Sequence, residues 1–272
     1  MCLLIFAWQV ISDHPLVVAA NRDERLDRPA EPMSVLRQGR PRIVGGRDGL
    51  AGGTWLAVNE LGVVAGLTNR PSPGGRDPSK RSRGELPLFA THGDSASSGV
   101  EALARRVRPG QYNPAWLLVG DRRRLFYVEV PAERPPRVEE LAPGIHVLEN
   151  IALDTPSWKT RRVRALLTQP SLSGDDLWTR LPYVLSDHLV PSDQEAELAV
   201  ELQQGQGDAV VRSSATLAAC VHTDDYGTRS AALVQVPARP EALPELRTSE
   251  GPPCTVPFVE KSSLWRSVET TG

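Results

Sequence analysis

Cys2, immediately after the initiator methionine, is the residue whose chemistry and position best suit it to act as a nucleophile. Methionine aminopeptidase generally removes a methionine that precedes a residue as small as cysteine. Without Met1, Cys2 would carry a thiol and a free α-amino group, whose pKa of roughly 7.7–8 lets it accept the thiol proton near neutral pH. One residue would then supply both a nucleophile and its base, as acyl transfer to a thiol requires. A cysteine in an apolar segment is also a common core residue.

Two apolar runs near the N-terminus predict a pair of strands that would position charged groups beside this cysteine. Leu3–Trp8 and Leu16–Ala20 are short, apolar and separated by a turn sequence, which is typical of paired, buried strands. The second run leads into Arg22 and Asp23, and strand pairing would bring both back toward Cys2. The alternative for this charged sequence is a solvated turn.

These neighbours would change the acidity of the thiol. An arginine beside a thiol lowers its pKa, and Asp23 could hold the α-ammonium group of Cys2 by a hydrogen bond. We therefore expect the pKa of Cys2 in the processed chain to lie below the usual ~8.5. We also expect iodoacetamide to alkylate Cys2 faster than Cys220 or Cys254 near pH 7.

Further polar groups stand where later predicted strands end. A hairpin predicted over Trp55–Leu67 ends in Thr68 and Asn69, a later strand ends in Asn150, and Arg229 lies near the start of another. Asparagine side chains are neutral hydrogen-bond donors of the kind that stabilise an oxyanion. Together with Cys2, these groups form an inventory sufficient for thiolate acyl transfer.

Strands occur in hairpins and helices are grouped between them, which favours an α+β fold of mostly antiparallel sheets over alternating βαβ units. The strands expected after the first pair are Trp55–Val58, Val63–Leu67, Ala115–Val119, Leu125–Val130, Ile145–Asn150, Thr216–Thr223, Ser230–Val236 and Val256–Glu260. The helices expected are Glu85–Ala90, Val100–Val107, Trp158–Leu167 and Asp175–Tyr183. We expect Thr155 to cap the third helix. Residues 25–42 and 131–144 are expected to be irregular, and residues 189–213 show no clear pattern.

Composition excludes several classes of function. The 272 residues carry a formal net charge of −2 with 40% hydrophobic and 24% charged residues, so no bias toward nucleic acid is present. No apolar run approaches the ~18 residues of a membrane span, and no glycine-rich phosphate-binding loop opens a helix. Three widely spaced cysteines show neither a disulfide framework nor metal-ligand spacing. We expect a cytoplasmic protein with a small-molecule substrate or ligand and with no cofactor or metal, and leave its oligomeric state open.

Several motifs, in order along nearly the whole chain, are similar to those of the NRDE family, the family of the transport and Golgi organisation protein. They are Met1-Cys2, Ala19–Glu24 with Arg28-Pro29, Gly52–Leu56, Leu67–Asn69, Ser82–Leu86, Asn150 ahead of Leu153–Pro156, and Tyr226–Ser230. The resemblance implies a four-layer αββα sandwich of the N-terminal-nucleophile hydrolase type, formed as a single domain over residues 1–272. It does not fix a function, because both amidohydrolase ancestry and haem or lipid handling are proposed for the family.

A more distant resemblance joins the chain to the choloylglycine hydrolase and penicillin V acylase group, which cleaves amide bonds with an N-terminal cysteine. This resemblance implies six catalytic residues, which are Cys2, Arg22, Asp23, Asn69, Asn150 and Arg229. One departure concerns Asn69: in that group the asparagine directly follows the Gly-Leu of its strand, whereas here Thr68 intervenes. Because a shift of one residue turns a side chain to the other face, either Thr68 or Asn69 could face the nucleophile.

The sequence is therefore compatible with two functions. The first is a hydrolase that uses Cys2 to cleave a non-peptide C–N bond in the amide of a small molecule after removal of Met1. The alternative is a binding or trafficking protein that carries haem or a lipid-like ligand on the same fold, with Cys2, Cys220 and His222 as candidate haem ligands. Cys220 and His222, two apart on a predicted strand, would share a face, but ordinary core and edge positions are the simpler explanation of this pair.

Overall fold

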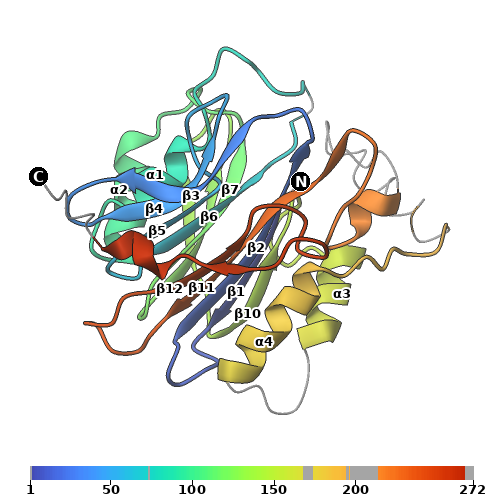
Figure 1. Ribbon diagram of the computed structural model, residues 1–272. Helices are drawn as coiled ribbons and strands as arrows, with labels where there is room; N and C mark the ends of the chain where they lie inside the picture. Colours follow the sequence, from blue (N-terminus) through green and yellow to red (C-terminus); the bar gives the residue numbers. More distant parts are fainter. Residues whose placement is uncertain (1, 73, 168–173, 194–195, 197–213, 267–272) are drawn as a thin grey trace, which may run out of the picture.

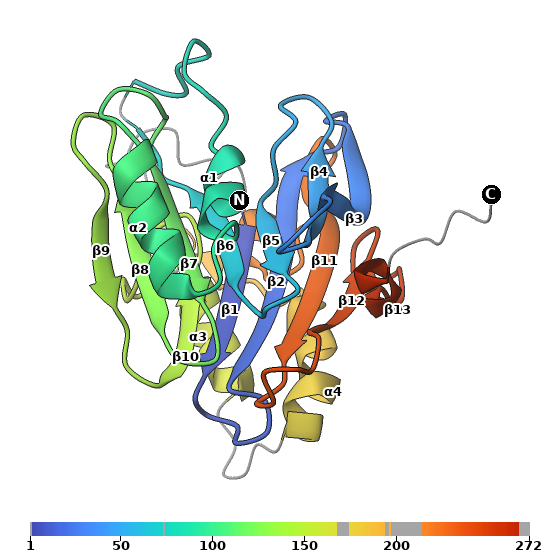
Figure 2. The same cartoon turned by 90° about the vertical axis from the view of Figure 1, so that its left-hand side faces the viewer.

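Two antiparallel sheets lie face to face, with helices on both outer faces, in the computed structural model, which describes residues 2–72, 74–167, 174–193, 196 and 214–266 (Figure 1). The side view shows the four layers: α1 and α2 cover one sheet, and α3 and α4 cover the other (Figure 2). The predicted α+β sandwich of mostly antiparallel sheets is confirmed.

The first sheet has the strand order β10-β1-β2-β11-β12-β13. Its strands are β1 (Cys2–Trp8), β2 (Leu16–Arg25), β10 (Gly144–Leu148), β11 (Tyr226–Val236), β12 (Glu245–Ser249) and β13 (Val259–Glu260). The predicted pairing of the two N-terminal runs is confirmed, and their antiparallel register sets Cys2 opposite Arg22.

The second sheet has the strand order β3-β4-β5-β6-β7-β8-β9. Its strands are β3 (Ala30–Arg37), β4 (Ile43–Asp48), β5 (Leu56–Asn59), β6 (Val64–Asn69), β7 (Ala115–Gly120), β8 (Leu125–Val130) and β9 (Arg137–Glu140). The hairpin predicted over Trp55–Leu67 is confirmed as β5–β6, and the strands predicted at Ala115–Val119 and Leu125–Val130 pair as β7 and β8.

The helices pack in pairs on the outer faces. They are α1 (Glu85–Ala90), α2 (Ala96–Arg106), α3 (Trp158–Leu167) and α4 (Gly174–Leu185), with short 3-10 turns η1 (Ser214–Leu217) and η2 (Ser262–Trp265). Within the described segments, no helix combines the length and apolar character needed to cross a bilayer.

The side chains of β1 alternate between two hydrophobic cores. Leu4 and Phe6 lie in the core between the sheets, whereas Leu3 and Ile5 lie in the core beneath α3 and α4. Because successive side chains of a strand point to opposite faces, a strand covered on both sides is apolar throughout. This is why Leu3–Trp8 is a continuous hydrophobic run, and it places Cys2 on the face of Leu4, between the sheets.

Three predicted segments differ from the structure. The stretches expected to be irregular, residues 25–42 and 131–144, contain the edge strands β3 and β9; the residues of β9 are exposed, and most of those of β3 are exposed or half-buried. Edge strands lack the alternating apolar pattern because one of their flanks meets solvent. The strand predicted at Thr216–Thr223 is wrong: η1 covers its first two residues, and His222 forms only an isolated bridge with Gly227.

The cap of α3 also differs from the prediction. The hydroxyl of Ser157, rather than that of Thr155, accepts a hydrogen bond from the backbone N–H of Thr160 at 3.0 Å, and the hydroxyl of Thr160 accepts one from the N–H of Ser157 at 3.1 Å. Such reciprocal bonds satisfy two backbone donors at a helix start. Most of residues 189–213 lie outside the described residues.

Candidate functional site

Cys2 is the first residue of β1, which lies between β2 and the edge strand β10 in the first sheet. Its cross-strand partner on β2 is Arg22, and the register of β10, with Leu148 opposite Leu4, brings Asn150 alongside it on the other flank. The backbone N–H of Cys2 donates to the side-chain oxygen of Asn150 at 2.9 Å. The nitrogen that would become the α-amine after removal of Met1 therefore already has a fixed acceptor.

Asn150 also links the two sheets. Its side-chain N–H₂ group donates to the backbone carbonyl of Asn69 at the end of β6, over 2.6 Å. One amide side chain thus positions the N-terminus of β1 relative to the second sheet, and the polar ends of three strands converge at Cys2.

A cavity of about 300 Å³, here called the Cys2 cavity, lies at this convergence. Its lining includes five arginines and three acidic residues. The charged lining residues are Arg22, Arg28, Arg76, Arg81, Arg83, Asp23, Glu24 and Asp48, and Cys2, Trp55 and Asn69 also contribute. Beyond Cys2, three of the other five site residues that the resemblance implied therefore border the cavity: Arg22, Asp23 and Asn69.

Arg22 is held by a ring contact and a hydrogen bond. Its guanidinium carbon lies 4.8 Å from the centroid of the Trp55 ring, a cation–π geometry. Its Nη2 donates to Asp48 at 3.3 Å, whereas the buried Nη1 has no hydrogen-bond partner among the described residues. Arg28 forms a two-bond pair with Asp48, at 2.8 and 3.1 Å. Although burial acts to raise it, these hydrogen bonds hold the pKa of Asp48 below its ordinary value.

The carboxylate of Asp23 is engaged on the opposite face of β2. Its Oδ1 accepts a 2.6 Å hydrogen bond from the hydroxyl of Thr228, and its Oδ2 lies 3.8 Å from the ammonium of Lys159 on α3. Both side chains of this ion pair are buried. Because neighbouring side chains alternate in a strand, Asp23 faces the helices while Arg22 faces the space between the sheets. That Asp23 holds the α-ammonium of Cys2 stays a prediction.

Thr68 and Asn69 point in opposite directions at the end of β6. Asn69 is exposed and borders the Cys2 cavity. Thr68 is fully buried, and its hydroxyl has no hydrogen-bond partner among the described residues. Alternation places Thr68 on the face of Gly66, where an added Cβ would meet Leu4 at 2.8 Å. Thr68 thus shares the interior between the sheets with Cys2, and Asn69 shares the open cavity with it.

Arg229 is not among the residues that line the cavity. The pairing of β11 with β2 shifts by one residue between Thr228 and Ser230, so Arg229 occupies a β-bulge. Its guanidinium donates to the backbone carbonyls of Arg25 and Leu26 at the surface. A bulge leaves one residue unpaired and redirects its side chain, which accounts for this departure from the predicted convergence.

Arg83 and Lys159 are functional candidates outside the predicted set. Burial, reinforced by the nearby charge of Arg76, lowers the pKa of Arg83 to about 10. Its Nη1 donates to the carbonyl of Pro114 at 3.1 Å. Lys159 shares the buried face of α3 with Val163, and a lysine at an apolar helical position is a sequence signal for a buried ion pair.

Burial raises the pKa of the Cys2 thiol in the chain that retains Met1, and the charge of Asp23 adds to this, whereas the terminal amino group and Arg22 act in the opposite direction. The lower pKa expected from the sequence applies to the processed chain, in which the ammonium group would be on Cys2 itself. In the unprocessed chain, desolvation outweighs the arginine.

Cys220 and His222, the other candidate haem ligands, lie outside the lining of the Cys2 cavity. The Cys220 sulfur lies 3.6 Å from Nε2 of His222. The two are therefore close, as predicted, but in an irregular segment rather than a strand.

Comparison with known proteins identifies relatives along most of the chain. The family model described as "Transport and Golgi organisation 2" matches residues 1–242. A Transport and Golgi organization protein 2 homolog from Bos taurus is 32% identical over 253 residues, which cover 88% of this chain and 89% of that protein.

Among solved structures, a Caenorhabditis elegans N-acylethanolamine-hydrolyzing acid amidase ortholog superposes with a TM-score of 0.50 at 12% identity, covering 88% of this chain and 94% of that one. A C2A mutant of conjugated bile acid hydrolase from Clostridium perfringens gives a TM-score of 0.47 at 10% identity over 96% of each chain. The likeness to the amidase shows that the two chains share a fold.

Proposed function

The chain belongs to the transport and Golgi organisation 2 family, and we propose that it is a hydrolase that uses Cys2, freed of Met1, to cleave a non-peptide amide bond in a small anionic molecule. The observation that carries this proposal is the position of Cys2: its thiol borders a cavity of about 300 Å³, and its backbone nitrogen is held by Asn150. A cavity of this size suits a small ligand rather than a folded partner.

The chemistry follows from the two groups that the processed residue would carry. The neutral α-amine takes the proton of the Cys2 thiol, and the thiolate attacks the amide carbonyl carbon of the substrate. The α-ammonium then gives the proton to the leaving nitrogen as the C–N bond breaks, which releases the amine and leaves a thioester on Cys2. A water molecule, deprotonated by the same amine, hydrolyses the thioester to a carboxylic acid and restores the thiol.

The residues around Cys2 have distinct parts in this proposal. Asn150 fixes the α-amine, as it holds the backbone nitrogen of Cys2 at 2.9 Å. Asn69, whose side chain is exposed at the cavity, is the candidate donor to the oxyanion. Arg22 offers a buried Nη1 without a partner among the described residues, so it can donate to a substrate oxygen. Without removal of Met1, the nitrogen of Cys2 is an amide and cannot act as a base.

The charge of the Cys2 cavity supports an anionic substrate. Arg83 joins no carboxylate in an ion pair among the described residues, and burial lowers its pKa to about 10. A desolvated cation is stabilised by an anionic partner, and guanidinium groups bind carboxylates and phosphates through paired hydrogen bonds. The amide cleaved would therefore carry a carboxylate or a similar anionic group near its reacting bond.

A paired panel of substrates tests this proposal. Each pair consists of an N-acyl amino acid and the corresponding neutral primary amide, so that only the charge differs. We expect the processed protein to hydrolyse the anionic member with the higher kcat/KM, Cys2→Ser to retain a trace, and Cys2→Ala to retain none above background.

Hydrolysis that persists in Cys2→Ala would contradict the nucleophile, and equal rates for both members of each pair would contradict the anionic preference. If Cys2 is inert toward alkylation in protein that lacks Met1, the alternative of a haem or lipid-like ligand carrier becomes the better account. Co-purifying ligands would then be identified from the native protein.

A further inference from the structure

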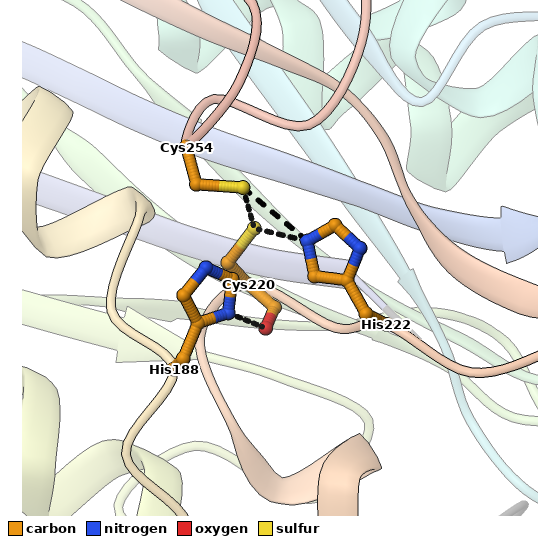
Figure 3. Close-up of side chains that lie close together, drawn as sticks. All are labelled: His188, Cys220, His222 and Cys254. Carbon is orange, nitrogen blue, oxygen red and sulfur yellow. Dashed lines mark hydrogen bonds between the residues drawn. The ribbon is translucent and has the colours of Figure 1, made fainter.

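Four metal-ligating side chains from three separate segments lie close together (Figure 3). These are His188, Cys220, His222 and Cys254, here called the His–Cys cluster. His188 follows α4, Cys220 and His222 precede β11, and Cys254 lies between β12 and β13. One ligand atom from each residue lies within 4.8 Å of the other three.

The distances among Cys220, His222 and Cys254 match those of a tetrahedral metal site, and the ligand atom of His188 lies within 4.8 Å of these three. A zinc ion ~2.3 Å from each sulfur and ~2.0–2.1 Å from each nitrogen sets an S···S separation of about 3.8 Å and an S···N separation of about 3.5 Å. The two sulfurs lie 3.8 Å apart. Nε2 of His222 lies 3.6 Å from the Cys220 sulfur and 3.3 Å from the Cys254 sulfur.

The surrounding backbone fixes the orientation of His188. Its Nδ1 lies 3.1 Å from the carbonyl oxygen of Cys220, so this nitrogen can donate its proton and leave Nε2 as a ligand. The N–H of Cys220 in turn donates to the carbonyl of Asp187 at 2.9 Å. Arg162 holds the carboxylate of Asp187 through two hydrogen bonds of 3.0 Å. The two ligand segments are thus locked together before any ion binds.

We propose that the His–Cys cluster binds one Zn²⁺ ion with all four side chains. Two thiolates and two neutral imidazoles suit this borderline-soft ion, and two thiolates neutralise its charge when the two thiol protons are released. Because the protein fills all four positions, no site remains for a reacting water, and the ion has a structural role. It cross-links the end of α4, the segment before β11 and the loop after β12. Four ligands around one point leave no equatorial space for a porphyrin.

The alternative for the same atoms is a disulfide between Cys220 and Cys254. Both cysteines are free, and their sulfurs are 3.8 Å apart, far beyond the ~2.05 Å of a disulfide bond. A disulfide would also leave both histidines without a role in the cluster. The two arrangements are mutually exclusive because a zinc ligand must be a thiolate.

The test uses the full chain, purified in the absence of chelators and under anaerobic conditions. Mass spectrometry of the metals should find about one zinc ion per chain. After removal of zinc, Co²⁺ should produce the visible absorption of a tetrahedral site and a thiolate-to-metal charge-transfer band in the near ultraviolet. Both signals are obtained on the unaltered protein, so they do not depend on the folding of any variant.

Cys254→Ser and His222→Gln are the test variants. Both side chains are exposed, so these substitutions should not disturb the core. Mutation of a residue that merely hydrogen-bonds to a metal ligand lowers metal affinity by about 10–100-fold. Loss of a ligand itself should therefore lower the affinity for zinc by at least about tenfold. Cys2→Ala and His146→Gln are matched controls with the same residue types outside the cluster, and both should retain the ion. Circular dichroism confirms that each variant is folded.

Three results would overturn the proposal. The first is purified protein with neither zinc nor a cobalt charge-transfer band. The second is a non-reducing intact mass that shows the loss of two hydrogens through a Cys220–Cys254 disulfide in freshly isolated protein. The third is metal content that is unchanged in folded Cys254→Ser.

Discussion

The Cys2 cavity and the His–Cys cluster both contain thiols, but their polar groups are arranged in opposite ways. Around Cys2, side chains line an open cavity, and Arg22 and Thr68 keep buried polar atoms without partners among the described residues. In the His–Cys cluster, the ligand atoms converge on one another within 4.8 Å. An open site with unused donors suits a substrate, whereas a closed tetrahedral set suits a structural ion.

A hydrogen-bond chain runs between the two regions. The hydroxyl of Thr228 accepts from the N–H of Val221, between the cluster ligands Cys220 and His222, and donates to Asp23. Asp23 follows Arg22 in β2. This strand therefore links the residues proposed to act in hydrolysis at the Cys2 cavity with the proposed zinc ligands of the His–Cys cluster.

The largest effect expected is the loss of hydrolysis in Cys2→Ala. Removal of a covalent nucleophile should lower kcat by roughly 10⁴-fold or more, while the zinc content of the same protein stays unchanged. Activity and metal content measured on one preparation check both halves of this prediction. Loss of zinc together with activity would show that the two regions are one functional unit.

The next effect concerns the Asp23–Lys159 ion pair. Lys159→Met leaves the buried carboxylate without this cation, which should lower the free energy of unfolding by about 3–5 kcal/mol. Lys261→Met is the matched control, because Lys261 also lies 3.8 Å from a carboxylate oxygen, that of Glu250, but is partly exposed. For Lys261→Met we expect the free energy of unfolding to fall by at most about 1 kcal/mol.

Urea unfolding of both lysine variants and of the unaltered chain supplies the measurement. Similar losses in the two variants would mean that burial does not strengthen the Asp23–Lys159 pair.

Arg83→Gln should weaken the binding of anionic substrates to the Cys2 cavity. A hydrogen bond to a charged group contributes about 1.5–3 kcal/mol, so KM should rise by roughly 10–100-fold for a carboxylate-bearing amide and little for its neutral counterpart. Arg105→Gln, on the exposed face of α2, is the control. A uniform rise of KM for both substrates would indicate a role for Arg83 in the shape of the cavity and not in charge recognition.

The smallest effect concerns the thiols. Only a thiolate is alkylated, so a thiol with a raised pKa reacts more slowly at a given pH. Because burial raises the pKa of Cys2 in the chain that retains Met1, a variant with an added N-terminal segment should be alkylated at Cys2 only as the pH rises above the ordinary ~8.5. The processed chain should react near pH 7.

Iodoacetamide labelling mapped by peptide mass gives the rates. Zinc should protect Cys220 and Cys254, and a chelator should expose Cys254, which lies at the surface. Equal reactivity of Cys2 in the extended and processed chains would remove the reason for assigning the α-amine a role.

The sequence predicts the Cys2 region well because strand pairing is encoded locally. Leu3–Trp8 and Leu16–Ala20 have the apolar pattern of paired strands, and their pairing places Arg22 opposite Cys2. Arg229 could not be placed in this way, since one bulged residue in β11 redirects its side chain. Bulges depend on how neighbouring strands fit and leave no fixed signature in the sequence.

The His–Cys cluster could not be predicted from spacing. His188 and Cys254 are 66 positions apart, and they meet only because α4 and the loop after β12 pack on the same side of the first sheet. Known zinc motifs hold ligands a few residues apart, and only Cys220 and His222 satisfy that here. The sequence does indicate the buried position of Lys159, because this lysine lies on the apolar face of α3.

The intact mass of the purified protein decides whether Cys2 becomes the N-terminal residue. We expect a mass lower than that of the full sequence by one methionine residue, with Cys2 identified at the N-terminus by peptide sequencing. A mass that retains Met1 would rule out the proposed hydrolase, because Cys2 would then have no α-amine to serve as its base.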